Sequence, residues 1–294
     1  MTDRSLKFSG HETFICKQLW PKKGFDFVME GNRFSDQDAI VKLGVGKNMV
    51  TSIRHWLKAL DIINIENELP QDIAKSILSD KEGFDPYLED IGTIWLLHYF
   101  LVKNEFASIY NLVFNEFRKE RFEFTKAQLH NFLKRKILQI QPNSYSKDII
   151  ERDISNFIRN YLSPNHKAGK VNIEEDFVGL FIDLNLLDYY KTEEGVEWYK
   201  IDSKERKELP HEIFLYTILD NPEFGTSVVF DDLRIKPNSP GLVFALNNEG
   251  IYDMINELIE LYPDINFSKT AGNQVLQLPS GLNKNQILKE YYGK

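Results

Sequence analysis

The stretch of sequence that most constrains the fold is residues 43–57, Leu-Gly-Val-Gly-Lys-Asn-Met-Val-Thr-Ser-Ile-Arg-His-Trp-Leu. The two glycines predict a turn, because glycine adopts backbone conformations that other residues disfavour. Apolar residues then recur at helical spacing up to residue 60, which predicts an amphipathic helix. A shorter helix is predicted before the turn, at residues 36–43, and a strand is predicted after the long helix, at residues 61–65. This order of elements predicts a winged helix-turn-helix within residues 1–82.

The face of the long helix opposite its apolar stripe carries side chains suited to DNA. Lysine neutralises phosphates, arginine makes bidentate contacts to phosphate or guanine, and hydroxyl or amide groups add hydrogen bonds. Between Asp38 and Asp61 the sequence holds no acidic residue that would offset these cations. The residues predicted to contact double-stranded DNA are Lys42, Lys47, Asn48, Thr51, Ser52, Arg54, His55 and Lys58.

The charge of the chain is unevenly distributed. Residues 1–58 hold ten Lys or Arg and six Asp or Glu, which is +4, so the remaining residues carry −12 of the total of −8. A net negative chain is poorly suited to coating nucleic acid without selectivity, because the phosphate backbone dominates such binding. A local basic surface on an acidic body suits a docked duplex.

Beyond residue 82 the sequence pattern is mostly helical. Helical periodicity covers residues 87–102, 107–117, 126–137, 146–162, 173–185 and 249–262. Alternating residues around 194–195 and 271–273 predict hairpins, residues 242–246 a short strand, and the polar residues 163–170 a linker. We therefore predict a mainly α fold with small β-hairpins (α+β). The predicted domains are 1–82 (winged helix), 83–162 (helical) and 163–294 (helix-plus-hairpin, winged-helix-like).

The candidates for catalysis are His11 and Glu12, in the segment Phe-Ser-Gly-His-Glu-Thr-Phe at residues 8–14. Histidine beside a carboxylate can act as a base and its orienting group. Adjacent residues of an extended strand face opposite ways, so the two cooperate only if the chain turns. A structural role, in which His11 or Glu12 satisfies buried backbone, is the alternative. No second His or Cys cluster has metal-ligand spacing, so no metal site is predicted.

Three further charged patterns can be interpreted either as functional sites or as ordinary solvent-exposed charge. Residues 202–204 (Asp-Ser-Lys), with Asp188 upstream, match a short nuclease pattern but also a solvated turn, and residues 231–236 are similar. A second basic region is diluted by nearby glutamates, so we expect a salt-bridged helix surface there rather than a second DNA contact. Its members are Arg118, Lys119, Arg121, Lys126, Lys134, Arg135 and Lys136.

The cellular compartment is indicated by two features. A single cysteine, Cys16, excludes an internal disulfide framework and fits a reducing compartment. The longest apolar stretch, residues 91–102, is shorter than the roughly 18 residues that a membrane span requires. The expected location is cytoplasmic, without membrane contact.

Several segments carry a resemblance to a known family. Residues 8–14, residues 20–24 (Trp-Pro-Lys-Lys-Gly) and above all residues 43–56 resemble a bacterial family of unknown function, the SspB-type proteins. These occur beside sulfur-handling enzymes in clusters for DNA phosphorothioation and phage defence. Weaker similarities at residues 87–98, 209–216 and 239–241 extend the resemblance over essentially the whole chain.

This resemblance implies a DNA-binding component of a phosphorothioation and anti-phage defence system that nicks one DNA strand. It implies a cysteine desulfurase and an ATP-pyrophosphatase-like enzyme as partners, and Mg²⁺ or Mn²⁺ as cofactor for a nickase. No catalytic residue is carried over, so the catalytic residues stay unknown.

Two alternatives fit the same residues. A winged-helix transcriptional regulator of a defence cassette would bind one operator, normally as a homodimer, and would not cleave DNA. A scaffold would use its acidic C-terminal part to recruit the sulfur-transfer enzymes.

Overall fold

The structure is a computed structural model, which describes residues 5–163, 179–270 and 272–293. The chain divides into two compact units, residues 1–201 and residues 202–294, each described here by itself. Each unit combines helices with one small antiparallel sheet, so the predicted α+β class is confirmed. The three-domain partition at residues 82 and 162 remains a prediction, and residues 164–170 of the predicted linker lie outside the described residues.

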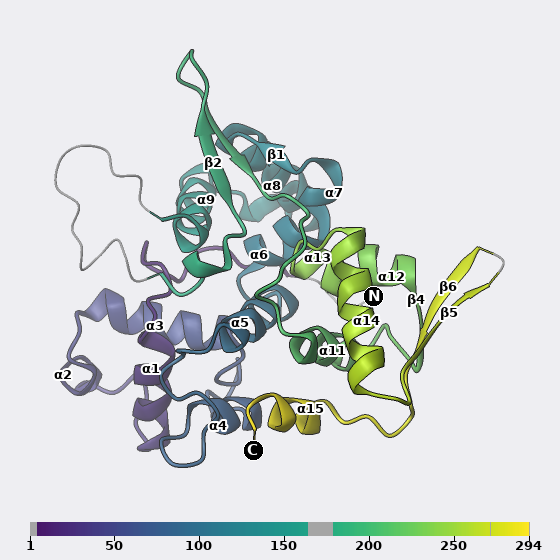
Figure 1. Cartoon of the computed structure of the whole chain (residues 1–294). Coiled ribbons are helices and arrows are strands. Elements are labelled where there is room, and N and C mark those ends of the chain that lie inside the picture. The colour runs from purple at the N-terminus through teal and green to yellow at the C-terminus, as the bar shows by residue number, and fades with distance from the viewer. Residues whose placement is uncertain (1–4, 164–178, 271, 294) are drawn as a thin grey trace. The chain divides into compact units, whose positions relative to one another are not determined.

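The first unit is largely helical (Figure 1). The α-helices among its described residues are α1 (Trp20–Met29), α2 (Ala39–Leu43), α3 (Lys47–Ala59), α4 (Asp72–Leu78), α5 (Ile91–Lys103), α6 (Ser108–Leu112), α7 (Arg118–Glu120), α8 (Lys126–Ile140) and α9 (Lys147–Tyr161). Six of its helices, α2, α3, α5, α6, α8 and α9, fall on predicted ranges, and α1, α4 and α7 were not predicted. A π-helical turn, η1 (Val113–Phe117), joins α6 to α7, and η2 (Pro142–Ser144) and η3 (Ile182–Leu184) are 3₁₀ turns.

The core of the first unit is built around α5. Nine of its thirteen residues are apolar or aromatic, and Gly92 to Val102 are all buried, so the helix is enclosed on every side. The carboxylate of Asp90 caps its first turn by accepting the backbone N–H groups of Gly92 and Thr93. His98 is fully buried and its Nδ1 lies 2.9 Å from the hydroxyl of Tyr161, as expected for a satisfied core histidine.

The sheet of the first unit has the strand order β1-β3-β2, with β1 (Glu123–Phe124), β2 (Asp188–Lys191) and β3 (Glu197–Lys200). The predicted hairpin around residues 194–195 is confirmed, with Gly195 at a φ of 85° in its turn. Tyr199 pairs in register with Tyr189 on one side and Phe124 on the other, which ties the hairpin to the helices. Residues 173–178 of the predicted helix at 173–185 lie outside the described residues, and its described part contains the 3₁₀ turn η3 and no α-helix.

The strand predicted at residues 61–65, all of them described, is not formed. A single β-bridge pairs Ile63 with Pro70 instead. Asp61 and Glu68 have φ values of 56° and 60°, which bend the backbone away from an extended strand. Pro70 has no N–H to donate to a ladder. The helix pair α2–α3 is therefore present, while the wing of the predicted N-terminal winged helix is reduced to one bridge.

The second unit alternates helices with a small sheet. Its elements are α11 (His211–Asp220), β4 (Ser227–Val229), α12 (Phe230–Ile235), α13 (Pro240–Val243), α14 (Asn248–Leu261), β5 (Asn266–Thr270), β6 (Asn273–Gln277) and α15 (Lys284–Tyr291). The sheet order is β4-β6-β5, all antiparallel. The predicted hairpin through residues 271–273 is confirmed and projects from the unit as the yellow arrows of Figure 1. None of the described helices has the length and apolar character needed to cross a membrane.

One strand predicted in the second unit is wrong. Residues 242–246 lie at the end of the short helix α13 and just after it. Pro240 occupies the first turn of that helix, where its fixed φ and missing N–H are tolerated, and Ser239 precedes it. The apolar run Leu242 to Leu246 is buried, which is why its composition resembles a core strand.

Candidate nucleic-acid interface

Helices α2 and α3 are joined by a tight turn that depends on glycine. Gly44 ends α2 with a φ of 62°, in the left-handed region. Helix α3 begins three residues later, at Lys47, after Gly46 in an extended conformation. Both predicted helices and the turn between them are therefore present.

Helix α3 has one buried face and one exposed polar face. Trp56, Leu57 and Ile53 are completely buried, and the indole Nε1 of Trp56 donates to the carbonyl oxygen of Phe14 at 3.2 Å. The exposed face carries cationic and hydrogen-bonding groups and no acid from α3 itself. Its exposed residues are Lys47, Asn48, Thr51 and Arg54, with Lys58 half-buried beside them.

Three of the predicted contact residues lie elsewhere. Ser52 is completely buried and His55 is 8% exposed, so both belong to the inner side of α3. Lys42 is exposed on α2, where its Nζ forms an ion pair with Asp38 at 2.9 Å. Helical periodicity alone placed residue 55 beside residue 54, but the packing turns its ring inward.

Two of the cations on α3 share one carboxylate. Arg54 Nε lies 2.7 Å from Glu68 Oε1, and Lys58 Nζ lies 2.6 Å from the same oxygen. Glu68 is held there by a turn in which Asn64 Oδ1 accepts two backbone N–H groups. Partial burial acts to raise the pKa of Glu68, but its hydrogen bonds with Arg54 and Lys58 outweigh this and lower it. The contact of Glu68 with α3 was not predicted from the sequence.

The segment at residues 8–14 connects α3 to α9. The backbone N–H of Ser9 donates to both carboxylate oxygens of Asp153, at 3.0 and 3.1 Å. His11 is 6% exposed and its Nε2 lies 3.0 Å from Asp153 Oδ1. Its Nδ1 accepts the N–H of Thr13, so Nε2 carries the proton and donates.

Glu12, the other catalytic candidate, is exposed and has a φ of 47°. The chain does turn at this point, but the buried ring of His11 is directed to Asp153. This network supports a positioning role for His11, and catalysis by His11 or Glu12 remains a prediction. Asp153 could not be recognised from the sequence, because it lies 142 residues away from His11.

The other charged patterns are paired on the surface. In the second basic region, Arg135 pairs with Glu120 and Lys136 with Glu116, as expected for a salt-bridged helix surface. The nuclease-like pattern at residues 202–204 belongs to the second unit, where Lys204 Nζ lies 3.9 Å from Asp202 Oδ2. Its proposed companion Asp188 belongs to β2 of the first unit.

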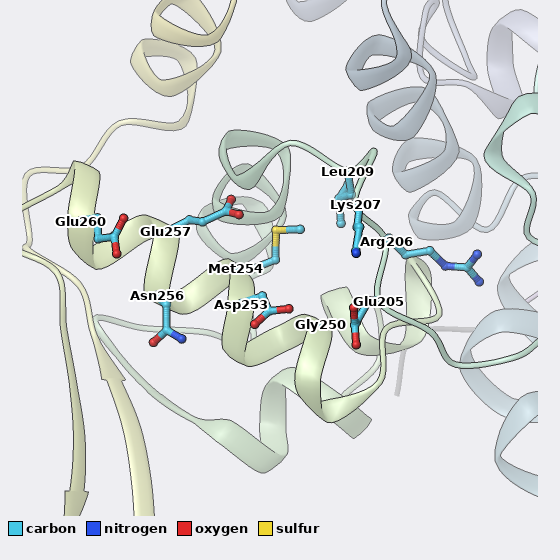
Figure 2. A pocket seen from close by; sticks show the side chains of 10 residues that line it. All are labelled: Glu205, Arg206, Lys207, Leu209, Gly250, Asp253, Met254, Asn256, Glu257 and Glu260. Atoms are coloured by element: carbon cyan, nitrogen blue, oxygen red, sulfur yellow. The ribbon is translucent and has the colours of Figure 1, made fainter.

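The second unit has an acidic groove of about 430 Å³ along α14. Figure 2 shows Asp253, Glu257 and Glu260 along this helix, with Lys207 on the facing segment. Met254 and Leu209 supply apolar wall, and both are buried. The groove is therefore a mixed acidic and apolar surface.

Within residues 5–163, 179–270 and 272–293 no group of three or more His, Cys, Asp or Glu side chains is arranged to hold a metal ion.

Comparison with known proteins identifies the family to which this chain belongs. A family model described as protein of unknown function (DUF4007) matches residues 8–292, and the chain belongs to that family.

Two solved structures then show which protein this chain is similar to. They are described as "Magnesium ion-bound SspB crystal structure" and "SspB crystal structure", with TM-scores of 0.86 and 0.84. Each is 26% identical, and the alignments cover 99% of this chain and 88% of the other chain. A comparison with curated proteins found no match. The predicted resemblance to the SspB-type family is confirmed.

Proposed function

We propose that this chain is the DNA-binding component of a bacterial phosphorothioation and anti-phage defence system, and that it docks duplex DNA through α3. The observation that carries the proposal is the exposed face of α3. Lys47, Thr51 and Arg54 point to solvent there, while the opposite face is fixed in the core. A helix held in this way presents its polar side chains as a rigid set, which suits the major groove.

The proposed surface is narrower than the sequence prediction. It comprises the exposed or half-buried residues Lys42, Lys47, Asn48, Thr51, Arg54 and Lys58. Ser52 and His55 are left out because they are buried. A phosphate that approaches Arg54 must compete with the carboxylate of Glu68, so Lys47 is the cation with the least competition: no acidic side chain is paired with it among the described residues.

The resemblance to SspB-type proteins supports the pathway and the partners in this proposal. It implies strand nicking, a cysteine desulfurase and an ATP-pyrophosphatase-like enzyme, as set out above. Replacing a phosphate oxygen by sulfur requires access to the backbone, which nicking one strand would provide. We assign no residue to that step.

The DNA-binding proposal is tested with two single variants. Lys47→Ala and Arg54→Ala should each weaken the affinity for a short duplex about tenfold at low salt. Each should also reduce the slope of log affinity against log salt by about one, because one phosphate contact is lost. Fluorescence anisotropy with labelled duplex at several salt concentrations measures both quantities.

A matched control is Lys289→Ala, which removes one exposed lysine from α15 of the second unit. It should leave both the affinity and the slope unchanged. Equal losses in all three variants would mean a non-specific charge effect, and no loss in Lys47→Ala or Arg54→Ala would remove α3 as the interface.

Nicking is tested by incubating the full-length protein with supercoiled plasmid, with Mg²⁺, Mn²⁺ or EDTA. Metal-dependent open circles that Arg54→Ala forms more slowly at low protein concentration would support an enzyme docked through α3. Retained duplex binding without open circles would favour the regulator or the scaffold instead.

A specific observation also favours the scaffold as a second candidate. The elements α11, β4, α12 with α13, α14, β5 and β6, with the sheet order β4-β6-β5, follow the arrangement of a winged helix. In that arrangement α14 holds the position of the recognition helix. Its exposed face is acidic, however, with Glu249, Asp253, Glu257 and Glu260 and no Lys or Arg in the helix. Such a face repels phosphate and attracts a basic protein surface.

The scaffold candidate predicts that the partner enzymes bind through the second unit. Asp253→Lys combined with Glu260→Lys in the full-length chain should abolish co-purification of the cysteine desulfurase or the ATP-pyrophosphatase-like enzyme. Binding of labelled duplex should persist. Co-purification that survives the double variant would count against this candidate.

A further inference from the structure

A cavity of about 500 Å³ in the first unit is used by none of the functions above. It is formed by segments far apart in the sequence: residues 5–10, His55 of α3, Phe106, and residues 141–149. Because His55 belongs to α3, the cavity and the proposed DNA surface share one rigid helix.

The wall of the cavity contains an unsatisfied polar side chain. His55 is 8% exposed, and its Nε2 is buried without a hydrogen-bond partner among the described residues. Burial, and secondly the nearby His11, lower the pKa of His55 to about 3, so its ring is neutral near pH 7. A neutral imidazole offers one donor and one acceptor. Leaving such groups unpaired is costly, which is why buried polar atoms nearly always have a partner.

Gly10 explains how the ring is kept at the cavity. A Cβ on Gly10 would lie 2.6 Å from His55 Nδ1, and the φ of Gly10 is 96°. Only glycine lets the backbone approach the ring at this distance in this conformation. Within residues 9–11 (Ser-Gly-His), Ser9 and Gly10 thus form one wall of the cavity, and Ser9 and His11 also bond to Asp153.

The other walls are aromatic and weakly cationic. Phe8 and Phe106 are both half-buried lining residues, and Lys7 Nζ lies 4.9 Å over the ring of Phe106. The exposed Ser144 lies at the edge, and the described lining includes no Asp or Glu. The cavity therefore combines phenyl rings, one neutral donor–acceptor group and one exposed cation.

We propose that this cavity receives an unpaired nucleobase of the DNA bound at α3, an inference that rests on the proposed function. A base has π faces for Phe8 and Phe106 and polar edges for His55, and the phosphate beside it suits Lys7. An aliphatic ligand would leave His55 unpaired. Stacking of a base on aromatic side chains is commonly a major part of the affinity for single-stranded nucleic acid.

The experiment uses the full-length protein and two labelled duplexes of one sequence, one fully paired and one with a single base opposite an abasic site. The unpaired base should raise the affinity about tenfold, the size of effect that one stacked base supplies. Ser144→Trp, which fills the mouth of the cavity, should abolish this preference and leave the affinity for the paired duplex unchanged. Asn143→Trp, on the neighbouring exposed residue, should keep the preference.

A preference that is missing in the wild type, or that survives Ser144→Trp, overturns the proposal. If Ser144→Trp melts at a lower temperature than wild type, Phe106→Leu replaces it, because it removes the ring and keeps apolar volume. That variant should lose most of the preference.

Failure of the DNA-binding proposal has a different signature, in which neither duplex binds. A free deoxynucleoside monophosphate then tests the cavity by calorimetry. Binding of that nucleotide without duplex binding would overturn a DNA-borne base as the occupant.

Discussion

Helices α3 and α14 are similar in pattern and opposite in charge. Both bury an apolar stripe in the core of their unit and expose a polar face. The sequence of α3 contains Lys47, Arg54 and Lys58 and no acid, whereas that of α14 contains four acids and no Lys or Arg. The three-stranded sheet β4-β6-β5 belongs to the unit of the acidic helix, whereas the predicted strand after the basic helix is only the bridge between Ile63 and Pro70.

This difference shows that arrangement and surface charge carry separate information. The arrangement decides how rigidly a helix is presented, and the charge decides which partner can approach it. The winged-helix arrangement proposed for the second unit would by itself favour α14 for DNA. The charge of the exposed face is the reason that α3 is proposed instead.

The comparison between the two helices can be tested first at His55, on the buried side of α3, where the largest effect on stability is expected. Its pKa is about 3 in the folded chain, so the folded state binds fewer protons than the unfolded state at mildly acidic pH. The stability contributed by His55 is present above the ordinary histidine pKa of about 6.5 and is lost as the pH falls toward 3. The free energy of unfolding of the first unit should fall by about 2 kcal/mol between pH 7 and pH 5 through this group.

Urea denaturation followed by tryptophan fluorescence measures this loss, because all four tryptophans lie in the first unit. His55→Phe keeps a flat ring without a titrating group, so its difference between pH 7 and pH 5 should be smaller by about 2 kcal/mol. An equal pH dependence in the two proteins would show that His55 is not held neutral.

A smaller effect is expected at Glu68, whose carboxylate pairs with both Arg54 and Lys58 of the α3 surface. Glu68→Gln should raise the affinity for duplex DNA about threefold, since Arg54 and Lys58 are freed from its carboxylate and exposed charges interact weakly. Glu66→Gln removes an exposed acid from the same turn without an ion pair to α3, and should change the affinity less. A fall in affinity for Glu68→Gln would mean that Glu68 positions Arg54 for DNA.

The smallest effect is expected at His211, which contacts the acidic groove helix of the second unit. Hydrogen bonding to Glu212, and then interaction with Glu257, raise the pKa of His211. The resulting stabilisation is present below the ordinary histidine pKa and is lost as the pH rises through the raised value, the opposite of His55. Because the pair is partly exposed, it should contribute less than about 1 kcal/mol. An NMR titration of the imidazole protons should show a lower pKa for His211 in Glu257→Gln, and no change would contradict the assignment.

Sequence periodicity predicted most helices of the first unit and both hairpins, because these depend on local patterns. It failed where long-range packing decided the outcome. Residues 61–65 have the composition of a strand but lack an extended partner, and residues 242–246 follow a proline that starts a helix. Local pattern cannot separate a buried strand from a buried helix end.

In the candidate site, too, local features were predicted from the sequence and features that depend on long-range packing were not. The exposed positions of Lys47, Thr51 and Arg54 followed from helical spacing. The inward turn of His55 and the contact of Glu68 with α3 did not, because each depends on a tertiary partner. The aromatic cavity at His55 joins four segments, so no single stretch of sequence could reveal it.

The link between residues 9–16 and α9 has a consequence for the timing of folding. Ser9 bonds to Asp153 and Cys16 to Asn160, each 144 residues further along the chain. At about 5–20 residues per second, a ribosome needs on the order of ten seconds to make that interval. During this time residues 9–16 cannot close against α9. Residues 9–16 are thus secured only after a much later part of their unit has been made.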